Sequence, residues 1–108
     1  MEVKVRFYAT YREITGSGEV MVALEEDADV EELLRRIFEK YEKLKDAIID
    51  KQTGNLSKYV KVFKNGRDID FLEGLSTKLN GGDLIVMFPP MAGGSLGKAT
   101  ESLNMKQP

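Results

Sequence analysis

The sequence of 108 residues predicts an α+β domain: a roll in which a mixed sheet packs against one main helix. Three observations support this fold class. Apolar and polar residues alternate at the start of the chain, as in a strand with one buried face. An apolar stripe at helical spacing follows. Close to residue 86 lies a short run that is apolar on both faces, which is typical of a strand in the middle of a sheet.

The first predicted strand covers residues 3–8, where Val3, Val5 and Phe7 alternate with polar neighbours. A turn with two glycines follows at residues 15–18, and the alternation resumes over residues 20–24. Two strands joined by a short link that contains glycine predict an N-terminal hairpin.

The predicted main helix begins at Asp29, a good N-cap, and Glu32 stands three residues later as in a capping box. The apolar stripe on this helix consists of Val30, Leu33, Leu34, Ile37, Phe38 and Tyr41. The segment from Glu25 to Glu32 is mostly acidic. One explanation is favourable placement of acidic residues near a helix N-terminus, and the other is an acidic docking face for a basic partner.

The second half of the chain predicts mostly strands and turns. Residues 42–58 indicate a short helical or turn segment and then a loop, and residues 59–64 indicate a strand. Asn65-Gly66 is a strong hairpin signal, so residues 67–69 can pair back briefly. Residues 71–75 are expected to form a turn whose apolar side chains pack on the core; these are Phe71, Leu72 and Leu75.

The last predicted strand, Leu84 to Phe88, follows a Gly-Gly-Asp turn and must end at Pro89-Pro90, because neither proline can donate to a sheet. Since this strand is apolar on both faces, we expect it to lie beside the first strand, with the helix across one face of the sheet. That order of elements predicts a β-grasp, or ubiquitin-like, roll.

The composition excludes several kinds of chemistry. The chain has no cysteine and no histidine, so thiol nucleophiles, imidazole bases and thiolate metal sites are excluded, and we expect neither a metal site nor a bound cofactor. A net charge of −2 argues against nucleic-acid binding. Charges interrupt the apolar residues at the N-terminus, and the chain has no long apolar run, so we expect a cytoplasmic protein with no membrane partner.

The segment after the last strand has the composition of a projecting arm. Pro89-Pro90 favours an extended polyproline conformation. Gly93 and Gly94 have no side chains, so they can enter a narrow channel and present their backbone closely to an enzyme. Taken alone, a Gly-Gly pair would also suit a flexible linker.

Two motifs near opposite ends of the chain resemble one known family. The segment Leu79 to Gly94, which includes the Gly-Asp turn, the apolar strand and Pro-Pro-x-x-Gly-Gly, is similar to the C-terminal signature of the MoaD/ThiS sulfur carriers. The segment Val5 to Gly16 resembles the opening strand and Arg-Glu-x-x-Gly turn of the same family. The resemblance is strongest to the small subunit of molybdopterin synthase and to the archaeal ubiquitin-like small modifiers.

This resemblance implies a carrier rather than an enzyme. An E1-like enzyme of the MoeB type would adenylate Gly94, and a sulfur donor would then displace AMP to leave a thiocarboxylate. A large subunit of the MoaE type would receive the arm and pass the sulfur to a pterin precursor for the molybdenum or tungsten cofactor. Gly94 would then provide the reacting acyl carbon, and Gly93 would be its slender neighbour.

The resemblance and the strand pattern together predict a docking surface. Leu84, Val86 and Phe88 share one face of the last strand, and Tyr8 can join their row. A single helix covers only one face of the sheet, so this row is expected to contact the partner enzymes. The alternative is that residues 42–58 fold over it. The remaining predicted contacts lie on the arm: Pro89, Pro90, Met91 and Ala92.

The chain departs from the family after Gly94, because residues 95–108 follow the Gly-Gly pair. We expect a domain at residues 1–94 and a flexible tail at residues 95–108. An amide bond at Gly94 leaves no carboxylate to adenylate. The tail is then either a pro-segment that a deubiquitinase-like metalloprotease removes, an artificial extension, or the mark of a member that has abandoned sulfur transfer.

Three other functions remain open at this point. The chain can be a ubiquitin-like modifier that is joined to lysines through Gly94, or a β-grasp interaction domain that forms no conjugates. A carrier of the thiamine pathway is a further alternative. Its subfamily has shorter chains.

Overall fold

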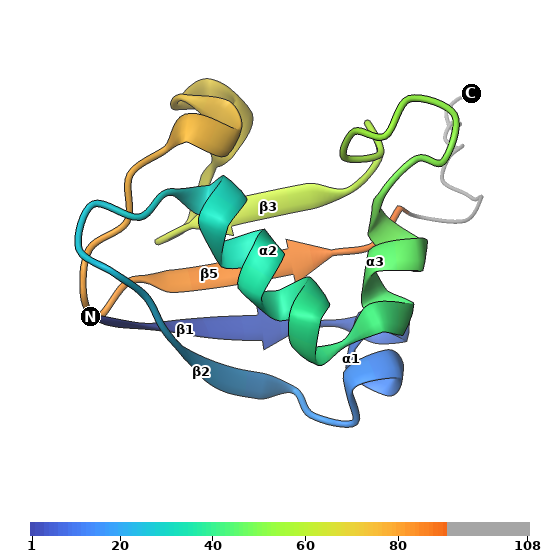
Figure 1. Cartoon of the computed structure of the whole chain (residues 1–108), viewed down its shortest axis with the longest axis horizontal. Coiled ribbons are helices and arrows are strands. Elements are labelled where there is room, and N and C mark those ends of the chain that lie inside the picture. The colour runs from blue at the N-terminus through green and yellow to red at the C-terminus, as the bar shows by residue number, and fades with distance from the viewer. Residues whose placement is uncertain (91–108) are drawn as a thin grey trace, which may run out of the picture.

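Val3, Val5 and Phe7 are almost completely buried, and they form the inner face of the first strand in a computed structural model that describes residues 1–90. The strands are β1 (Glu2–Phe7), β2 (Glu19–Ala23), β3 (Lys61–Lys64), β4 (Arg67–Asp68) and β5 (Leu84–Phe88). They form one mixed sheet in the order β2-β1-β5-β3-β4 (Figure 1). β5 therefore lies in the middle, parallel to β1 and antiparallel to β3. The prediction for β5 is confirmed.

Two helices cover one face of this sheet, and a third lies at its end. α2 (Val30–Lys40) and α3 (Glu42–Ile48) lie in front of the strands in Figure 1, and α1 (Ala9–Thr15) lies where β1 ends. Leu33, Ile37, Leu44 and Ile48 point from α2 and α3 into the core. This is the ubiquitin-like β-grasp fold that the sequence predicts.

The start of α2 follows the predicted capping chemistry only in part. The Asp29 carboxylate accepts a hydrogen bond from the backbone N–H of Glu32 at 3.0 Å. The Glu32 carboxylate does not return to the backbone of Asp29. Instead it forms ion pairs with Arg35 and Arg36 on the next turn of the helix.

The predicted N-terminal hairpin is correct in its pairing and wrong in its connection. β1 and β2 pair antiparallel in continuous register, but the link between them includes the helix α1. Tyr11 is the one residue of α1 that is fully buried, so the sequence offers no extended apolar stripe to indicate a helix. The left-handed Gly16 ends it, at φ 73°.

The β3–β4 hairpin turns at Asn65-Gly66 as expected, with φ values of 50° and 87° that suit a tight turn of this kind. The following segment forms two short 3₁₀ helices, η1 (Ile69–Phe71) and η2 (Gly74–Ser76). The expectation that Phe71 packs on the core is wrong, because its side chain is 87% exposed. Ile69 takes the buried position instead. The helices among residues 1–90 are too short or too polar to span a bilayer.

Candidate functional site

An aromatic cluster lies on the face of the sheet opposite α2 and α3, where β5 ends. It consists of Tyr8, Phe63 and Phe88. The rings of Tyr8 and Phe88 are stacked, with centroids 5.0 Å apart and an angle of 9° between their planes. Phe63 meets Phe88 edge to face, with centroids 5.6 Å apart. Tyr8 and Phe88 are 40% and 39% exposed, which is high for aromatic side chains in mutual contact.

Strand register brings these three side chains together. Ile85 and Met87 of β5 are fully buried under the helices, so the alternating residues Leu84, Val86 and Phe88 point to the other face. Because β3 is antiparallel to β5, Phe63 is the register partner of Val86. The cluster therefore forms on the outer face of β5 and β3, beside the end of β1.

Tyr8 occupies a bend between β1 and α1. Its backbone is extended, with φ −122° and ψ 157°. Ala9 then has a left-handed φ of 54°, a strained conformation for a residue with a Cβ atom. This bend ends β1 and leaves Tyr8 on the outer face, where it stacks on Phe88.

Ion pairs flank the cluster on both sides. On the β2 side, Nε and Nη2 of Arg6 donate to one carboxylate oxygen of Glu19 at 2.9 and 2.7 Å. Glu19, and after it the Tyr8 hydroxyl, raise the pKa of Arg6, and Arg6 lowers the pKa of Glu19. Lys4 also lies 3.8 Å from Glu19, so this side of the cluster presents two cations around one carboxylate.

On the β4 side, Lys61 lies 3.2 Å from Asp68 and 3.6 Å from Asp70. Hydrogen bonding to Asp68 raises the pKa of Lys61. The pKa of Asp68 is lowered chiefly by the backbone N–H of Asp70, which donates to it at 2.9 Å, and then by Lys61. The apolar cluster is thus bordered by polar pairs, as in the centre and rim of a docking surface.

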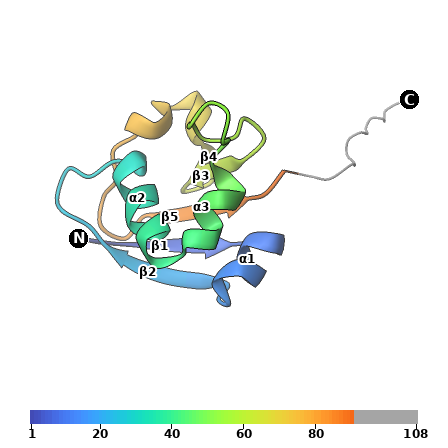
Figure 2. The same cartoon turned by 45° about the vertical axis from the view of Figure 1, so that its right-hand side comes forward.

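The chain leaves the sheet beside this cluster. Phe88 is the last residue of β5, and Pro89 and Pro90 follow it away from the strands (Figure 2). The predicted residues Met91, Ala92, Gly93 and Gly94 and the predicted tail at residues 95–108 lie outside the described residues. Within residues 1–90 there is no group of acidic side chains arranged to hold a metal ion.

The predicted docking residues occupy different depths. Tyr8 and Phe88 are exposed, Leu84 is half-buried, and Val86 is buried at 9% exposure. Val86 therefore supports the cluster from below rather than forming its surface. Residues 42–58 pack on the helical side through Leu44 and Ile48, so they do not cover the outer face.

Phe63 is the site residue that sequence reasoning missed. It lies in a strand where Val60 and Val62 point inward, so the alternation alone places it on the outer face. The sequence does not reveal that β3, rather than β2, pairs with β5 on this side, and this pairing is what brings Phe63 beside Phe88.

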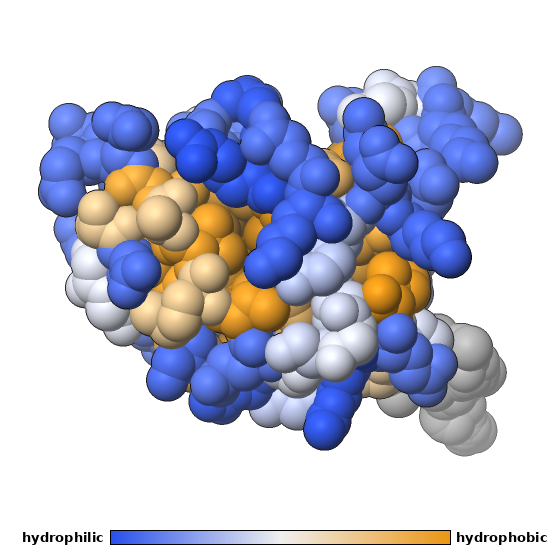
Figure 3. All heavy atoms as spheres, turned by 60° about the horizontal axis from the view of Figure 1, so that its bottom comes forward, coloured by the Kyte–Doolittle hydropathy of each residue, from blue (hydrophilic) through white to orange (hydrophobic). Residues whose placement is uncertain are grey.

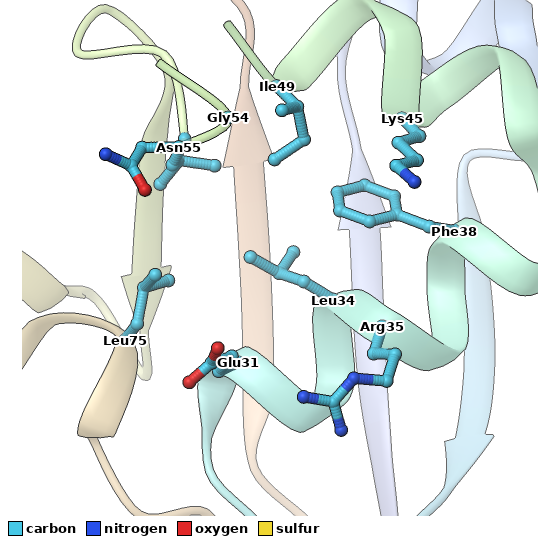
Figure 4. A pocket seen from close by; sticks show the side chains of 10 residues that line it. Glu31, Leu34, Arg35, Phe38, Lys45, Ile49, Gly54, Asn55 and Leu75 are labelled. Carbon is cyan, nitrogen blue, oxygen red and sulfur yellow. The ribbon is translucent and has the colours of Figure 1, made fainter. Parts of the chain in front are cut away.

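Apart from the aromatic cluster, a hollow of about 240 Å³ lies on the helical side (Figure 4). Leu34 and Phe38 of α2 face Ile49 and Leu75 across it, and Glu31, Arg35 and Lys45 also line it. Its lining residues include no serine, threonine or tyrosine hydroxyl.

Comparison with known proteins shows the family to which the sequence is similar. Residues 5–94 match the model of the ThiS family. The small archaeal modifier protein 3 of Haloferax volcanii is 38% identical over 94 residues, which are 87% of this chain and 100% of that protein.

Two solved structures are also similar to this chain in fold and sequence. The small archaeal modifier protein 1 of Methanosarcina acetivorans superposes with a TM-score of 0.76 at 35% identity, over 86% of this chain and 96% of that one. A candidate subunit 1 of the molybdopterin converting factor from Pyrococcus furiosus gives a TM-score of 0.68 at 28% identity, over 84% and 99% of the two chains.

Proposed function

The chain belongs to the ThiS family of ubiquitin-like β-grasp proteins, and on that premise we propose that it carries sulfur as a thiocarboxylate on Gly94 for the synthesis of molybdopterin. The observation that carries the proposal is the position of the aromatic cluster. The chain departs toward Gly94 from the same end of β5 that presents Phe88 and Tyr8. A partner that binds the cluster is therefore placed to receive the arm.

The chemistry assigns separate tasks to this chain and its partners. Hydrolysis of the bond between Gly94 and Ser95, by a deubiquitinase-like metalloprotease, frees the Gly94 carboxylate. That carboxylate attacks the α-phosphorus of ATP in an E1-like enzyme of the MoeB type, and pyrophosphate leaves. A sulfide equivalent then attacks the acyl carbon, a C–S bond forms, and the C–O bond to AMP breaks.

The final step takes place in a large subunit of the MoaE type. The thiocarboxylate sulfur bonds to a carbon of the pterin precursor and displaces an oxygen from that carbon. Water then cleaves the acyl C–S bond, which restores the Gly94 carboxylate and leaves the sulfur on the pterin. The side chains of residues 1–90 provide docking for these steps, not acid or base catalysis, which agrees with the lack of histidine and cysteine. The arm residues Pro89, Pro90, Met91 and Ala92 would lie in the partner's channel.

Intact-mass analysis of protein from its native host tests this proposal. We expect a species that ends at Gly94 and carries sulfur in place of one oxygen. If only the 108-residue chain is found while the cofactor is being made, the carrier proposal is wrong.

A second candidate function is attachment to other proteins. The 38% identity with a small archaeal modifier protein along that protein's whole length favours it. Conjugation would use the same adenylated Gly94, but the attacking group would be a lysine amine, and AMP would leave as an isopeptide bond forms. To separate this function from sulfur transfer, conjugates from the native host can be digested and searched for lysines that carry the C-terminal residues of this arm.

A further inference from the structure

β2 is an edge strand, and the outward backbone groups of Met21 and Ala23 have no hydrogen-bond partner among residues 1–90. Within residues 1–90, β1 is its one strand partner. Met1 and Leu24 exchange both of their backbone hydrogen bonds, each 2.8 Å long. Along an antiparallel strand, successive residues point their backbone N–H and C=O groups alternately toward the partner strand and away from it. Val20 and Val22 therefore bond to β1, whereas Met21 and Ala23 point these groups away from the sheet.

This edge lacks the features that usually prevent strands from pairing. Its sequence is Glu-Val-Met-Val-Ala, with neither proline nor lysine, and its register with β1 contains no bulge. Its one charged residue, Glu19, forms ion pairs with Arg6 and Lys4 of β1. The Ser17 hydroxyl donates to the Glu19 carbonyl at 2.8 Å and accepts from the Glu19 N–H at 3.3 Å, so strand pairing at Glu19 must replace these two local bonds. The other two outward-pointing residues, Met21 and Ala23, make no hydrogen bond to the described chain through these groups.

Apolar surface continues from the edge into a groove between β2 and α2. A view from the β2 side shows apolar side chains gathered between hydrophilic borders (Figure 3). Val20 and Val22 point toward the core yet remain partly exposed, above the buried Ile37. These three residues line a hollow of about 390 Å³. On the other face of β2, Met21 is 52% exposed. The inner face of the edge is therefore apolar, and its outer face carries the exposed Met21 between Glu19 and Ala23.

We propose that a second copy of this chain pairs with β2, antiparallel and centred on Met21. The two Met21 residues would then lie opposite each other, and Glu19 of each copy would lie opposite Ala23 of the other. No like charges meet in this register. A register centred on Val22 would place Glu19 opposite Glu25, so charge selects the arrangement centred on Met21.

The residues beside the groove also suit a two-fold contact. Arg36, Glu39 and Lys40 of α2 line it, so each copy brings both signs of charge to the seam, and a self-complementary surface is what a two-fold interface requires. The two-fold axis of an antiparallel pair is perpendicular to the sheet. The aromatic clusters of both copies would share one face of a continuous ten-stranded sheet, given five strands in each copy, and the two arms would leave in opposite directions.

Sedimentation of the full chain over a range of concentrations tests the dimer. We expect a reversible shift to twice the monomer mass. Met21→Lys places two positive charges directly opposite each other and should weaken the dimer about tenfold or more, the scale of a central interface residue. Phe71→Lys is the matched control, because Phe71 is another exposed apolar residue, outside the groove, and it should leave the dimer intact.

Cysteine cross-linking tests the register and does not depend on affinity. The chain has no cysteine, so Met21→Cys introduces a single thiol that should form an intermolecular disulfide on mild oxidation. Ala23→Cys should not, because its counterpart lies about four residues away along the partner strand. Circular dichroism shows whether each variant is folded.

Several outcomes would overturn the proposal. One is a wild-type chain that stays monomeric at every concentration, as expected if residues 91–108 or a strand of another protein occupies the edge. A Met21→Lys variant that dimerises as the wild type does, or cross-linking by Ala23→Cys but not by Met21→Cys, would also overturn it.

Discussion

The side-chain amide of Asn65 donates a hydrogen bond to the buried carboxylate of Asp83, with 2.9 Å between Nδ2 and Oδ1. The same Asn65 side chain accepts a hydrogen bond from the backbone N–H of Leu84 at 2.9 Å. The other oxygen of Asp83 accepts from the backbone N–H of Asn80 at 2.7 Å. These bonds join the β3–β4 turn to the turn before β5, so they fix the start of the strand whose other end presents the arm.

The first prediction follows from this network. Asp83→Asn keeps the size of the side chain but places an amide donor against groups that are themselves donors. We expect a loss of about 1–3 kcal/mol in the free energy of unfolding, the cost of an unsatisfied buried polar group. Urea denaturation measures it. Asp70→Asn is the control, since Asp70 is exposed, and it should change stability little. Equal effects of the two variants would contradict the role given to Asn65 and Asp83.

The second prediction concerns the aromatic cluster. Tyr8→Asp or Phe88→Asp should weaken binding to the E1-like enzyme or the large subunit by more than about 2 kcal/mol, roughly thirty-fold, because each places a charge in the centre of the contact. Isothermal titration calorimetry measures the affinity.

Both residues are substantially exposed, so the variants should remain folded. Phe71→Asp is again the control, and we expect it to bind as the wild type does. Normal binding by both cluster variants, or unfolding of both, would show that these residues are not the docking surface.

The third prediction uses the buried phenol of Tyr11. Its side chain is 1% exposed, and its hydroxyl has no hydrogen-bond partner in the described chain. Burial raises the pKa of Tyr11 from 10.0 to about 12. Above pH 10 the unfolded chain loses this proton while the folded chain keeps it, so the unfolded state binds fewer protons. Stability is therefore fully present below pH 10 and falls as the pH rises toward 12.

Tyr11→Phe removes the ionisable hydroxyl and keeps the ring. We expect it to be neutral or stabilising at pH 7, because the hydroxyl has no partner to lose, and to reduce the fall in melting temperature between pH 10 and 12. Thermal melts at a series of pH values measure both effects. An alkaline profile that is the same as that of the wild type would show that Tyr11 does not titrate as described.

The fourth prediction concerns the segment after Gly94. The full 108-residue chain has no carboxylate at Gly94, so it should be inert to ATP and the E1-like enzyme. A chain that stops at Gly94 should be adenylated, with a similar melting temperature. Pyrophosphate exchange on the two chains side by side measures this. Equal activity would mean that Gly94 is not the reactive group, and inactivity of both would favour an interaction domain without this chemistry.

Much of the fold was predictable because it depends on local periodicity. Alternation along β1 and the stripe on α2 reveal which side chains are buried, whatever the partner element is. The two apolar faces of β5 likewise predicted its central position. The exit of the arm beside Tyr8 and Phe88 followed from the same alternation and from the two prolines that end β5.

Periodicity does not show which elements contact one another, and only the tertiary structure decided this. α1 is too short and too sparsely apolar to be recognised from periodicity, and Tyr11 is its one fully buried residue. Phe71 has the character of a core residue but lies at the surface, whereas Ile69 of the same short helix is buried. Phe63 joins the aromatic cluster because β3 pairs with β5. Burial pattern is a property of each segment, whereas contact between distant segments depends on the pairing of the whole sheet.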